Sequence, residues 1–197
     1  MSIDHAAAPL TSGERHTAAP SATGLVVRAA RHDEAQALSA LALRSKGWWG
    51  YSASFLRACE AELTLTEADA ARCVVIEVDG VVAGFHLLSA SRGRAGVDGD
   101  GSAVGELDML FVDPPFIGAG VGRILFEDAR RRAAAAGWAR PQIEADPHSR
   151  TFYERLGAVQ VGERLSRSIP GNSLPLFELT LRAPGGGRMV ARATYWR

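Results

Sequence analysis

Lysine is almost absent from this chain. Among its 197 residues, 22 are basic and 22 are acidic, which gives a formal net charge of zero, and Lys46 is the single lysine. Long nucleic acids and anionic membranes are bound through an excess of basic side chains. The balanced charge therefore argues against a nucleic-acid partner and against a membrane partner. It still leaves room for a few arginines that hold one phosphate group.

Cysteine is scarce too. Cys59 and Cys73 form no CxxC pair and have no histidine cluster at zinc spacing beside them, so we expect two reduced, buried thiols and no metal site. No apolar run approaches the roughly 20 residues of a membrane-spanning helix. The start of the chain lacks the basic segment and apolar segment of a secretory signal. Together these absences predict a cytoplasmic protein.

Hydrophobic periodicity is confined to the middle of the chain. Residues 1–24 are rich in Ala, Ser, Thr, Pro and Gly and have no period, which predicts a disordered leader. Residues 25–182 carry the patterned segments and are expected to form one domain, since a domain takes roughly 100–200 residues. Residues 183–197 are expected to form a C-terminal tail.

Two local patterns are specific enough to place elements. Asp79-Gly80 separates two β-branched runs, over residues 73–78 and 81–89, and predicts a hairpin. Asp33 is expected to cap a helix that runs to about Lys46 and buries a stripe formed by Ala37, Leu38, Leu41 and Ala42.

The remaining segments set the fold class. Further strands are expected over residues 25–28, 106–112, 142–145, 158–161 and 177–181, and further helices over residues 52–62, 121–136 and 147–156. This order predicts the α/β class: a single domain with a mixed, mostly antiparallel central sheet of six to seven strands, flanked by about four helices.

The most informative stretch is the glycine turn, residues 118–122 with the sequence GAGVG, which follows a strand and begins a helix. Glycines let backbone N–H groups converge, and a helix start adds partial positive charge, so the turn suits a phosphate group. A P-loop is excluded because its lysine is missing, and GxGxG departs from the GxGxxG spacing of a dinucleotide site, although Glu144 lies at a suitable distance for one. Glycines that only permit close packing of helix and strand remain the alternative.

Residues 112–122, VDPPFIGAGVG, resemble the acyl-CoA pyrophosphate loop of the GNAT superfamily of N-acetyltransferases. Residues 146–157, DPHSRTFYERLG, resemble its N-x-x-A-x-x-x-Y-x-x-x-G element, with Asp146 at the asparagine position and Tyr153 at the tyrosine. The segments RSKGWWGYSASF and SIPGNSLPLFEL resemble parts of one bacterial subgroup, so the resemblance spans about residues 25–181. It implies a GNAT-like domain that transfers acetyl from acetyl-CoA to an amine, most favourably on a small molecule.

The resemblance also implies which residues hold the co-substrate. It places the oxyanion donor and the pantetheine contacts on the backbone of Leu110, Phe111 and Val112, where the strand diverges from its neighbour. Asp146 would contact the pantetheine arm. Where the superfamily usually has Arg or Gln, this chain has Ile117, and Arg123 is a candidate to replace that side chain. The pyrophosphate loop comprises Ile117, Gly118, Ala119, Gly120, Val121, Gly122 and Arg123.

Acetyl transfer needs a base and an acid. Glu106 lies four residues before Leu110 and is expected on the same face because strand side chains alternate, and it is predicted to take the ammonium proton directly or through a water. Asp108 shares that face and is its rival. The resemblance assigns Tyr153 as the acid that protonates the thiolate. The alternative roles are a structural hydrogen bond for Glu106 and a buried aromatic for Tyr153.

An aromatic cluster follows the first helix. The resemblance puts one wall of the acceptor pocket there, formed by Trp48, Trp49, Tyr51 and Phe55, although these rings could equally fix two helices to the sheet. His86 and His148 are expected to be structural or solvent-facing, and residues 130–132, three arginines in a row, are expected to form a solvated helix face.

Two other functions remain open. One is a non-catalytic acyl-CoA-binding sensor, and the other is an acetyltransferase that modifies proteins or peptides. A homodimer is possible, with Tyr195 and Trp196 of the tail docked on a partner chain.

Overall fold

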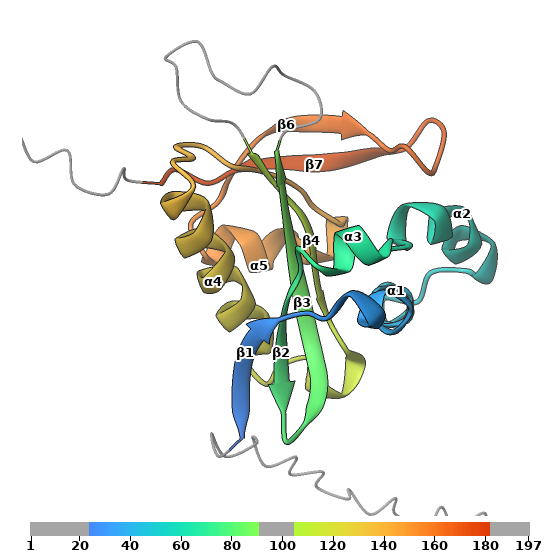
Figure 1. The fold of residues 1–197 in the computed structure, drawn as a ribbon. Coiled ribbons are helices and arrows are strands. Elements are labelled where there is room, and N and C mark those ends of the chain that lie inside the picture. The colour runs from blue at the N-terminus through green and yellow to red at the C-terminus, as the bar shows by residue number, and fades with distance from the viewer. Residues whose placement is uncertain (1–23, 91–104, 182–197) are drawn as a thin grey trace, which may run out of the picture.

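A seven-stranded sheet in the order β1-β2-β3-β4-β5-β7-β6 runs through the protein (Figure 1). The computed structural model describes residues 24–90 and 105–181. Neighbouring strands are antiparallel, except that β4 and β5 are parallel. The strands are β1 (Leu25–Ala29), β2 (Val74–Val78), β3 (Val81–Ala90), β4 (Gly105–Val112), β5 (Gln142–Glu144), β6 (Val159–Leu165) and β7 (Ser173–Glu178).

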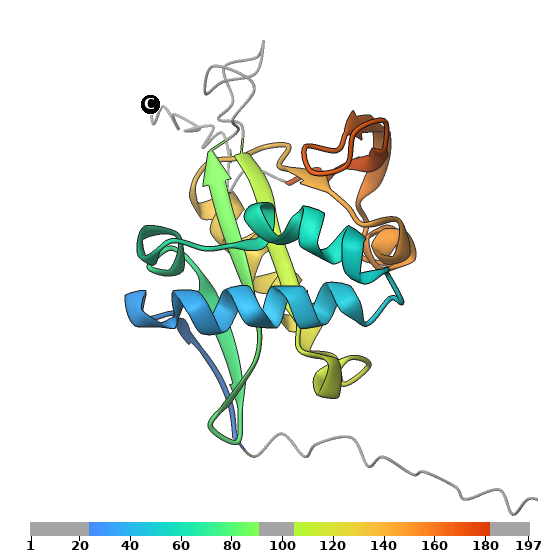
Figure 2. The same ribbon diagram turned by 90° about the vertical axis from the view of Figure 1, so that its right-hand side faces the viewer.

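Helices cover both faces of the sheet. On one face α1 and α2 lie side by side across the strands, with α3 next to them, and on the other face lie α4 and α5 (Figures 1 and 2). The predicted α/β class, with a mixed and mostly antiparallel sheet, is confirmed. The helices are α1 (Ala35–Gly47), α2 (Ala53–Leu63), α3 (Glu67–Ala70), α4 (Val121–Ala135) and α5 (Arg150–Arg155), with 3-10 turns η1 (His32–Glu34), η2 (Pro114–Phe116) and η3 (Pro147–Ser149).

The core is divided by the sheet into two halves. Leu38 and Leu41 of α1 pack on Phe85 of β3 in the half below α1–α3. In the half below α4 and α5, Phe126 packs with Phe177 of β7. Because both faces are covered, the central strands read as nearly continuous apolar runs rather than as strict alternation.

The β2–β3 hairpin forms as predicted. Asp79 and Gly80 have φ angles of 51° and 79°, so both central residues adopt the left-handed conformation that a tight type I′ turn requires. The turn brings Val78 opposite Val81 and fixes the register of the two strands, apart from a shift between Ile76 and Glu77.

The parallel pair β4–β5 separates almost where it begins. A single registered pair, Glu106 with Gln142, joins the two strands. Beyond it β4 continues to Val112, while β5 ends at Glu144. The sheet therefore opens on the β5 side of Leu110–Val112, where these residues of β4 have no registered strand partner among the described residues.

A β-bulge in β4 corrects the prediction that Glu106 and Leu110 share a face. Leu87 is opposite Met109, but Leu88 is opposite Leu107, so Asp108 is an extra residue in β4. Leu107 and Leu110 consequently both belong to the core beside α4 and α5, although they are three residues apart. Glu106 alternates with Leu107 and faces the α1–α2 side.

Two helix predictions also need correction. Asp33 does not cap α1; it lies in η1, and the carboxylate of Glu34 accepts the backbone N–H of Arg31 at 2.7 Å instead. Ala37 is exposed, whereas Ala35 and Ser45 are buried. The helix therefore begins at Ala35, after the 3-10 turn, and Leu38, Leu41 and Ala42 of the predicted stripe are buried as expected.

The last hairpin is longer than predicted. β7 begins at Ser173 rather than at residue 177, and β6 continues to Leu165, which is paired with Ser173. Pro175 weakened the strand signal because proline lacks an N–H group for the ladder, yet it lies in register with Glu163. The predicted long loop is thus reduced to a turn over residues 166–172.

The predicted leader and tail, including Tyr195 and Trp196, lie outside the described residues, apart from Gly24. Within residues 24–90 and 105–181, no helix has the length and apolar character needed to cross a membrane.

Glu34 ties the N-terminal strand to the rest of the fold. Its carboxylate receives two hydrogen bonds from Arg28 of β1, at 2.7 and 2.8 Å, and Arg28 also contacts Glu77 of β2. The bonds from Arg28, together with the backbone N–H of Arg31, lower the pKa of Glu34 to about 2. A carboxylate with a lowered pKa stabilises the fold at neutral pH, and this contribution is lost as the pH falls from about 4.5 to about 2.

We therefore expect Glu34→Gln to lower the free energy of unfolding by about 2–3 kcal/mol at pH 7, with a difference that shrinks below pH 4.5 and vanishes near pH 2. Denaturant unfolding of both proteins across this pH range measures it. Glu154→Gln, at a half-exposed position of α5, is the control with little expected effect. A difference that stays constant down to pH 2 would contradict the assignment.

Candidate active site

A cavity of about 990 Å³ extends from the glycine turn, along the opening between β4 and β5, to the ends of α1 and α2. Segments that are far apart in the sequence line it: β4, the glycine turn, the end of α1, one side of α2, the end of β5 with η3 and α5, and the β6–β7 turn. The opening of the sheet is what joins these segments around one space.

The glycine turn forms the end of the cavity where α4 begins. Gly118 and Gly120 have φ angles of 86° and 87°, and Gly120 is the N-cap of α4. Because α4 starts at Val121, the N–H groups of its first turn have no acceptor within the helix. Such a turn offers backbone donors and a positive helix end to an anion.

The predicted loop residues divide into two groups. Ile117, Gly118, Gly120, Gly122 and Arg123 line the cavity, whereas Ala119 and Val121 do not. Val121 is buried in the core under α4 and faces the loop only through its backbone. Ile117 contributes an apolar residue to this part of the lining, and Arg123 contributes the one cation of the segment 117–123.

Leu110, Phe111 and Val112 all line the cavity, next to the turn. They belong to the part of β4 that lies beyond its registered pair with β5. The structure thus places the predicted β4 segment and the predicted loop along one continuous wall.

Tyr153 lines the cavity from α5. Its ring packs with those of Phe126, Phe152 and Phe177, and the residue is only 6% exposed. Burial raises the pKa of the Tyr153 hydroxyl, with a smaller contribution from the charge of Asp146. The hydroxyl therefore keeps its proton at neutral pH, as a proton donor must.

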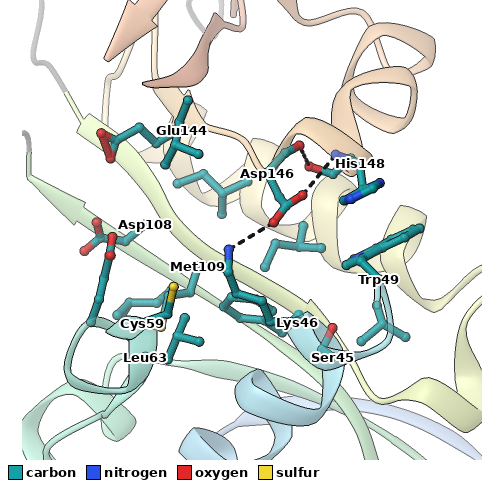
Figure 3. A pocket seen from close by; sticks show the side chains of 18 of the residues that line it. Ser45, Lys46, Trp49, Cys59, Leu63, Asp108, Met109, Glu144, Asp146 and His148 are labelled. Carbon is teal, nitrogen blue, oxygen red and sulfur yellow. Dashed lines mark hydrogen bonds and ion pairs between the residues drawn. The ribbon is translucent and has the colours of Figure 1, made fainter. Parts of the chain in front are cut away.

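Asp146 is fully engaged by its own chain (Figure 3). One carboxylate oxygen accepts Lys46 Nζ at 3.0 Å, and the other accepts the Tyr51 hydroxyl at 2.9 Å and the His148 backbone N–H at 2.9 Å. Lys46 also lies over the rings of Tyr51 and Phe55, at 5.3 and 5.6 Å. Burial, followed by the charge of Asp146, raises the pKa of Tyr51. The predicted contact of Asp146 with pantetheine stays a prediction.

The aromatic cluster contributes two of its four predicted residues, Trp49 and Phe55, to the cavity. Trp49 lines it and stacks in parallel on His148, with the ring centroids 5.3 Å apart. Trp48 is 57% exposed and lies outside the lining. Tyr51 also lies outside and stacks on Phe55 instead. His148 was expected to be structural or solvent-facing, and it is exposed, but it also belongs to the cavity wall.

The two candidate bases lie differently. Glu106 is 7% exposed, does not line the cavity, and has its carboxylate 3.0 Å from Nη1 of Arg164. Asp108 does line the cavity and accepts the Ser89 hydroxyl at 2.7 Å. The bulge at Asp108 turns the two carboxylates into different surroundings, a difference that regular alternation does not predict.

His86 belongs to a separate buried network. Its Nε2 is 2.9 Å from Asp128 of α4, and Asp128 in turn accepts hydrogen bonds from Arg131 and Arg132. Burial lowers the pKa of His86, which keeps the ring neutral. The predicted structural role fits this position, while two of the three arginines in residues 130–132 are partners of a buried carboxylate rather than a purely solvated face.

Sequence reasoning missed several lining residues. Lys46, Glu144 and Glu62 line the cavity, as do residues 166–169 of the β6–β7 turn. The composition could have pointed to Lys46, because it is the single lysine of the chain. The turn had no such signal, because the position of β7 was predicted wrongly.

Among residues 24–90 and 105–181 there is no group of three or more His, Cys, Asp or Glu side chains that could hold a metal ion. Both cysteines are free and buried. Burial raises the pKa of Cys59, and it raises that of Cys73 to about 12, which keeps both thiols protonated.

An open sheet beside a glycine turn at a helix start, with a buried tyrosine facing the opening, is the architecture of an acyl-CoA-dependent acyltransferase. Residues 36–158 match the model of the Acetyltransferase (GNAT) family, and the chain belongs to that family. Acetyl-CoA is the co-substrate of these enzymes. The predicted family and enzyme class are therefore confirmed, and so is the predicted co-substrate at the level of the family.

Individual relatives agree with this membership. A mycothiol acetyltransferase from Nocardiopsis dassonvillei is 37% identical over 82 residues, which are 40% of this chain and 24% of that protein, so the match spans about a quarter of the relative. Two solved structures share the fold. A GCN5-related N-acetyltransferase from Rhodopseudomonas palustris has a TM-score of 0.63 at 20% identity, covering 81% of this chain and 97% of that one. The PaiA N-acetyltransferase from Thermoplasma acidophilum, in complex with coenzyme A, has a TM-score of 0.62 at 16% identity, covering 81% and 100%.

Arg123 is the candidate to supply the phosphate-binding side chain that Ile117 lacks. We expect Arg123→Ala to raise the Kd of acetyl-CoA about tenfold at low salt, since a hydrogen bond to a charged group contributes about 1.5–3 kcal/mol, with a smaller effect at high salt. Calorimetric titration measures it. Arg130→Ala, on the exposed face of the same helix, is the matched control. An unchanged Kd would show that the backbone holds the phosphates without Arg123.

Proposed function

We propose that the protein transfers the acetyl group of acetyl-CoA to the amine of a small molecule by direct attack. The observation that carries the proposal is the continuous cavity, which has an anion-binding turn at one end and a wall of aromatic and charged side chains at the other. Between them lies the opening of the sheet, where a thioester can meet an amine. The mycothiol acetyltransferase supports a small-molecule acceptor, as far as its partial match reaches.

The reaction makes three chemical demands. An alkylammonium with a pKa near 10.4 is neutral in only about one molecule in 2,500 at pH 7, which costs about 4.6 kcal/mol, so a base is needed. The tetrahedral intermediate needs hydrogen-bond donors for its oxyanion. The departing thiolate needs a proton.

We assign each of these three tasks to residues around the opening of the sheet. The backbone of Leu110–Val112 supplies the oxyanion donor, and Tyr153 supplies the proton for the thiolate. Glu106 contributes to removal of the ammonium proton. Because its carboxylate is bound to Arg164 and lies outside the cavity lining, it acts through an intervening group rather than by direct contact.

An assay of thiol release distinguishes the proposed function from two alternatives. A non-catalytic acyl-CoA sensor binds acetyl-CoA but releases no thiol with any amine. A protein or peptide acetyltransferase releases thiol with peptides in preference to small amines. The proposal predicts thiol release with small amines, and the possible homodimer stays a prediction beside it.

Tyr153→Phe tests the proton donor. The variant keeps the ring that packs among three phenylalanines and loses the hydroxyl. We expect kcat to fall by about 10²–10³, because general acid catalysis contributes on that scale, while the Kd of acetyl-CoA stays the same. Thiol release and calorimetric titration measure the two quantities. A kcat equal to that of the wild type would leave Tyr153 with only a packing role.

Glu106→Gln tests the contribution of the β4 carboxylate. We expect a lower kcat at neutral pH and a shifted pH profile, because the substitution removes a charge that acts on proton removal. Initial rates from pH 5 to 9 measure both. An unchanged rate and profile would reduce Glu106 to the structural partner of Arg164.

A further inference from the structure

Glu144 ends β5 at the opening of the sheet and lines the cavity. The neighbouring residue Ile143 is buried in the core beside α4 and α5, so alternation turns Glu144 to the other face, toward α1 and α2. Its Oε1 atom is buried and has no hydrogen-bond partner. Within residues 24–90 and 105–181, the only other buried side-chain polar atom in that condition is Nδ1 of His86, outside the cavity.

The other carboxylates that line the cavity already have hydroxyl donors. Each accepts a hydrogen bond from a serine, threonine or tyrosine side chain, and so has less capacity for a new donor. These carboxylates are Glu62, Asp69, Asp108 and Asp146. Glu144 is therefore the lining carboxylate with an oxygen that still needs a donor, and a buried polar atom left in that condition is costly.

Charged groups from four other elements surround Glu144. Arg164 of β6 lies 3.6 Å from Oε1, and Arg167 of the β6–β7 turn lies 3.4 Å from Oε2. Glu106 of β4 and Glu62 of α2 approach through these two arginines, at 3.0 Å from Arg164 and 3.7 Å from Arg167. On the same side of the pocket lies Asp108 (Figure 3). Burial, the largest influence, raises the pKa of Glu144 despite both arginines.

Arg167 is a replaceable partner. Its side chain is 51% exposed, and it reaches Glu144 and Glu62 only over 3.4 and 3.7 Å. Ion pairs at such exposure contribute about 0–1 kcal/mol. A second cation of suitable shape can therefore take its place beside Glu144 at small cost.

We propose that Glu144 is the residue that binds the ammonium group of the acceptor and accepts its proton, in the place that the guanidinium of Arg167 now contacts. This inference rests on the proposed function and gives that same site its acceptor-binding residue. The acceptor class is accordingly an amine that arrives as a cation.

The proton balance follows from this assignment. The ammonium gives one proton to the carboxylate of Glu144, and the lone pair left on nitrogen then forms the C–N bond with the acetyl carbon. When the intermediate collapses, the C–S bond breaks and the thiolate takes the proton of the Tyr153 hydroxyl. The remaining extra proton on nitrogen restores Tyr153, and Glu144 returns its proton to water. The products are the amide, coenzyme A and one released proton.

Glu106 has a defined part in this arrangement. It binds Arg164, the arginine that also lies 3.6 Å from Glu144, and its negative charge raises the pKa of Glu144. Removing that charge in Glu106→Gln should move the acidic limb of the pH profile to lower pH. Glu144→Gln should remove the limb altogether, because the titrating group itself is gone.

Binding of 2-phenylethylamine to the full chain saturated with coenzyme A tests the ammonium site without turnover. We expect Glu144→Gln to weaken this amine about tenfold, as loss of a charged hydrogen bond does, and to leave binding of the uncharged 2-phenylethanol unchanged. Arg167→Gln should tighten the amine severalfold. Glu163→Gln, an exposed glutamate of β6, is the matched control.

The carboxyl ¹³C resonance of Glu144, assigned by its loss in Glu144→Gln, should shift as the amine saturates the wild type. Equal amine affinity in the wild type and Glu144→Gln overturns the inference, and so does a Glu144 resonance that does not respond to millimolar amine. An unchanged Kd for coenzyme A in Glu144→Gln shows that the variant is folded.

Kinetics with acetyl-CoA separate this inference from the proposed function. If the wild type turns over amines and Glu144→Gln keeps the acidic limb with the same kcat, the inference fails and the proposed function stands. If the amine binds at Glu144 but no thiol is released, the ammonium site stands and the proposed transfer fails.

Discussion

The separation of β4 from β5 is the constraint on which the rest of the structure depends. Parallel strands normally pair along their length and satisfy their backbone groups in one another. Here the pairing ends after Glu106 and Gln142, so the next residues of β4 have a free edge in the middle of a sheet. A buried edge of this kind is costly unless something binds it, and the cavity gives a ligand that place. The glycine turn, Tyr153 and Glu144 line one cavity because they border the same opening.

Local signals in the sequence predicted much of this arrangement. The pair Asp79-Gly80 fixed its hairpin because few other residues adopt a left-handed conformation, and Gly118 and Gly120 marked the turn for the same reason. Pro147 and Gly157 marked the ends of the last short helix, since proline suits a helix start and glycine a helix end. These signals lie in adjacent residues, so no tertiary information was needed to read them.

The errors arose where tertiary contacts override the local pattern. The bulge at Asp108 depends on how β4 meets β3, and nothing in the residues of β4 announces it. Pro175 argued against a strand that pairing with β6 nevertheless enforces. The predicted residues of β4 and of the glycine turn therefore mostly line the cavity, whereas the lining residues of α1, α2 and the β6–β7 turn were mostly not predicted.

The bond between Lys46 and Asp146 has a consequence for the chemical durability of the protein. Acetyl-CoA is a thioester that acylates neutral amines, and Lys46 carries the one side-chain ε-amine in the chain. That amine is bound to a carboxylate at 3.0 Å and is largely shielded from solvent, so this ion pair must break before the amine can act as a nucleophile. Arginine bears the other basic charges, and its delocalised guanidinium is a poor nucleophile at neutral pH. The protein can thus hold a reactive acyl donor while offering it almost nothing of itself to modify.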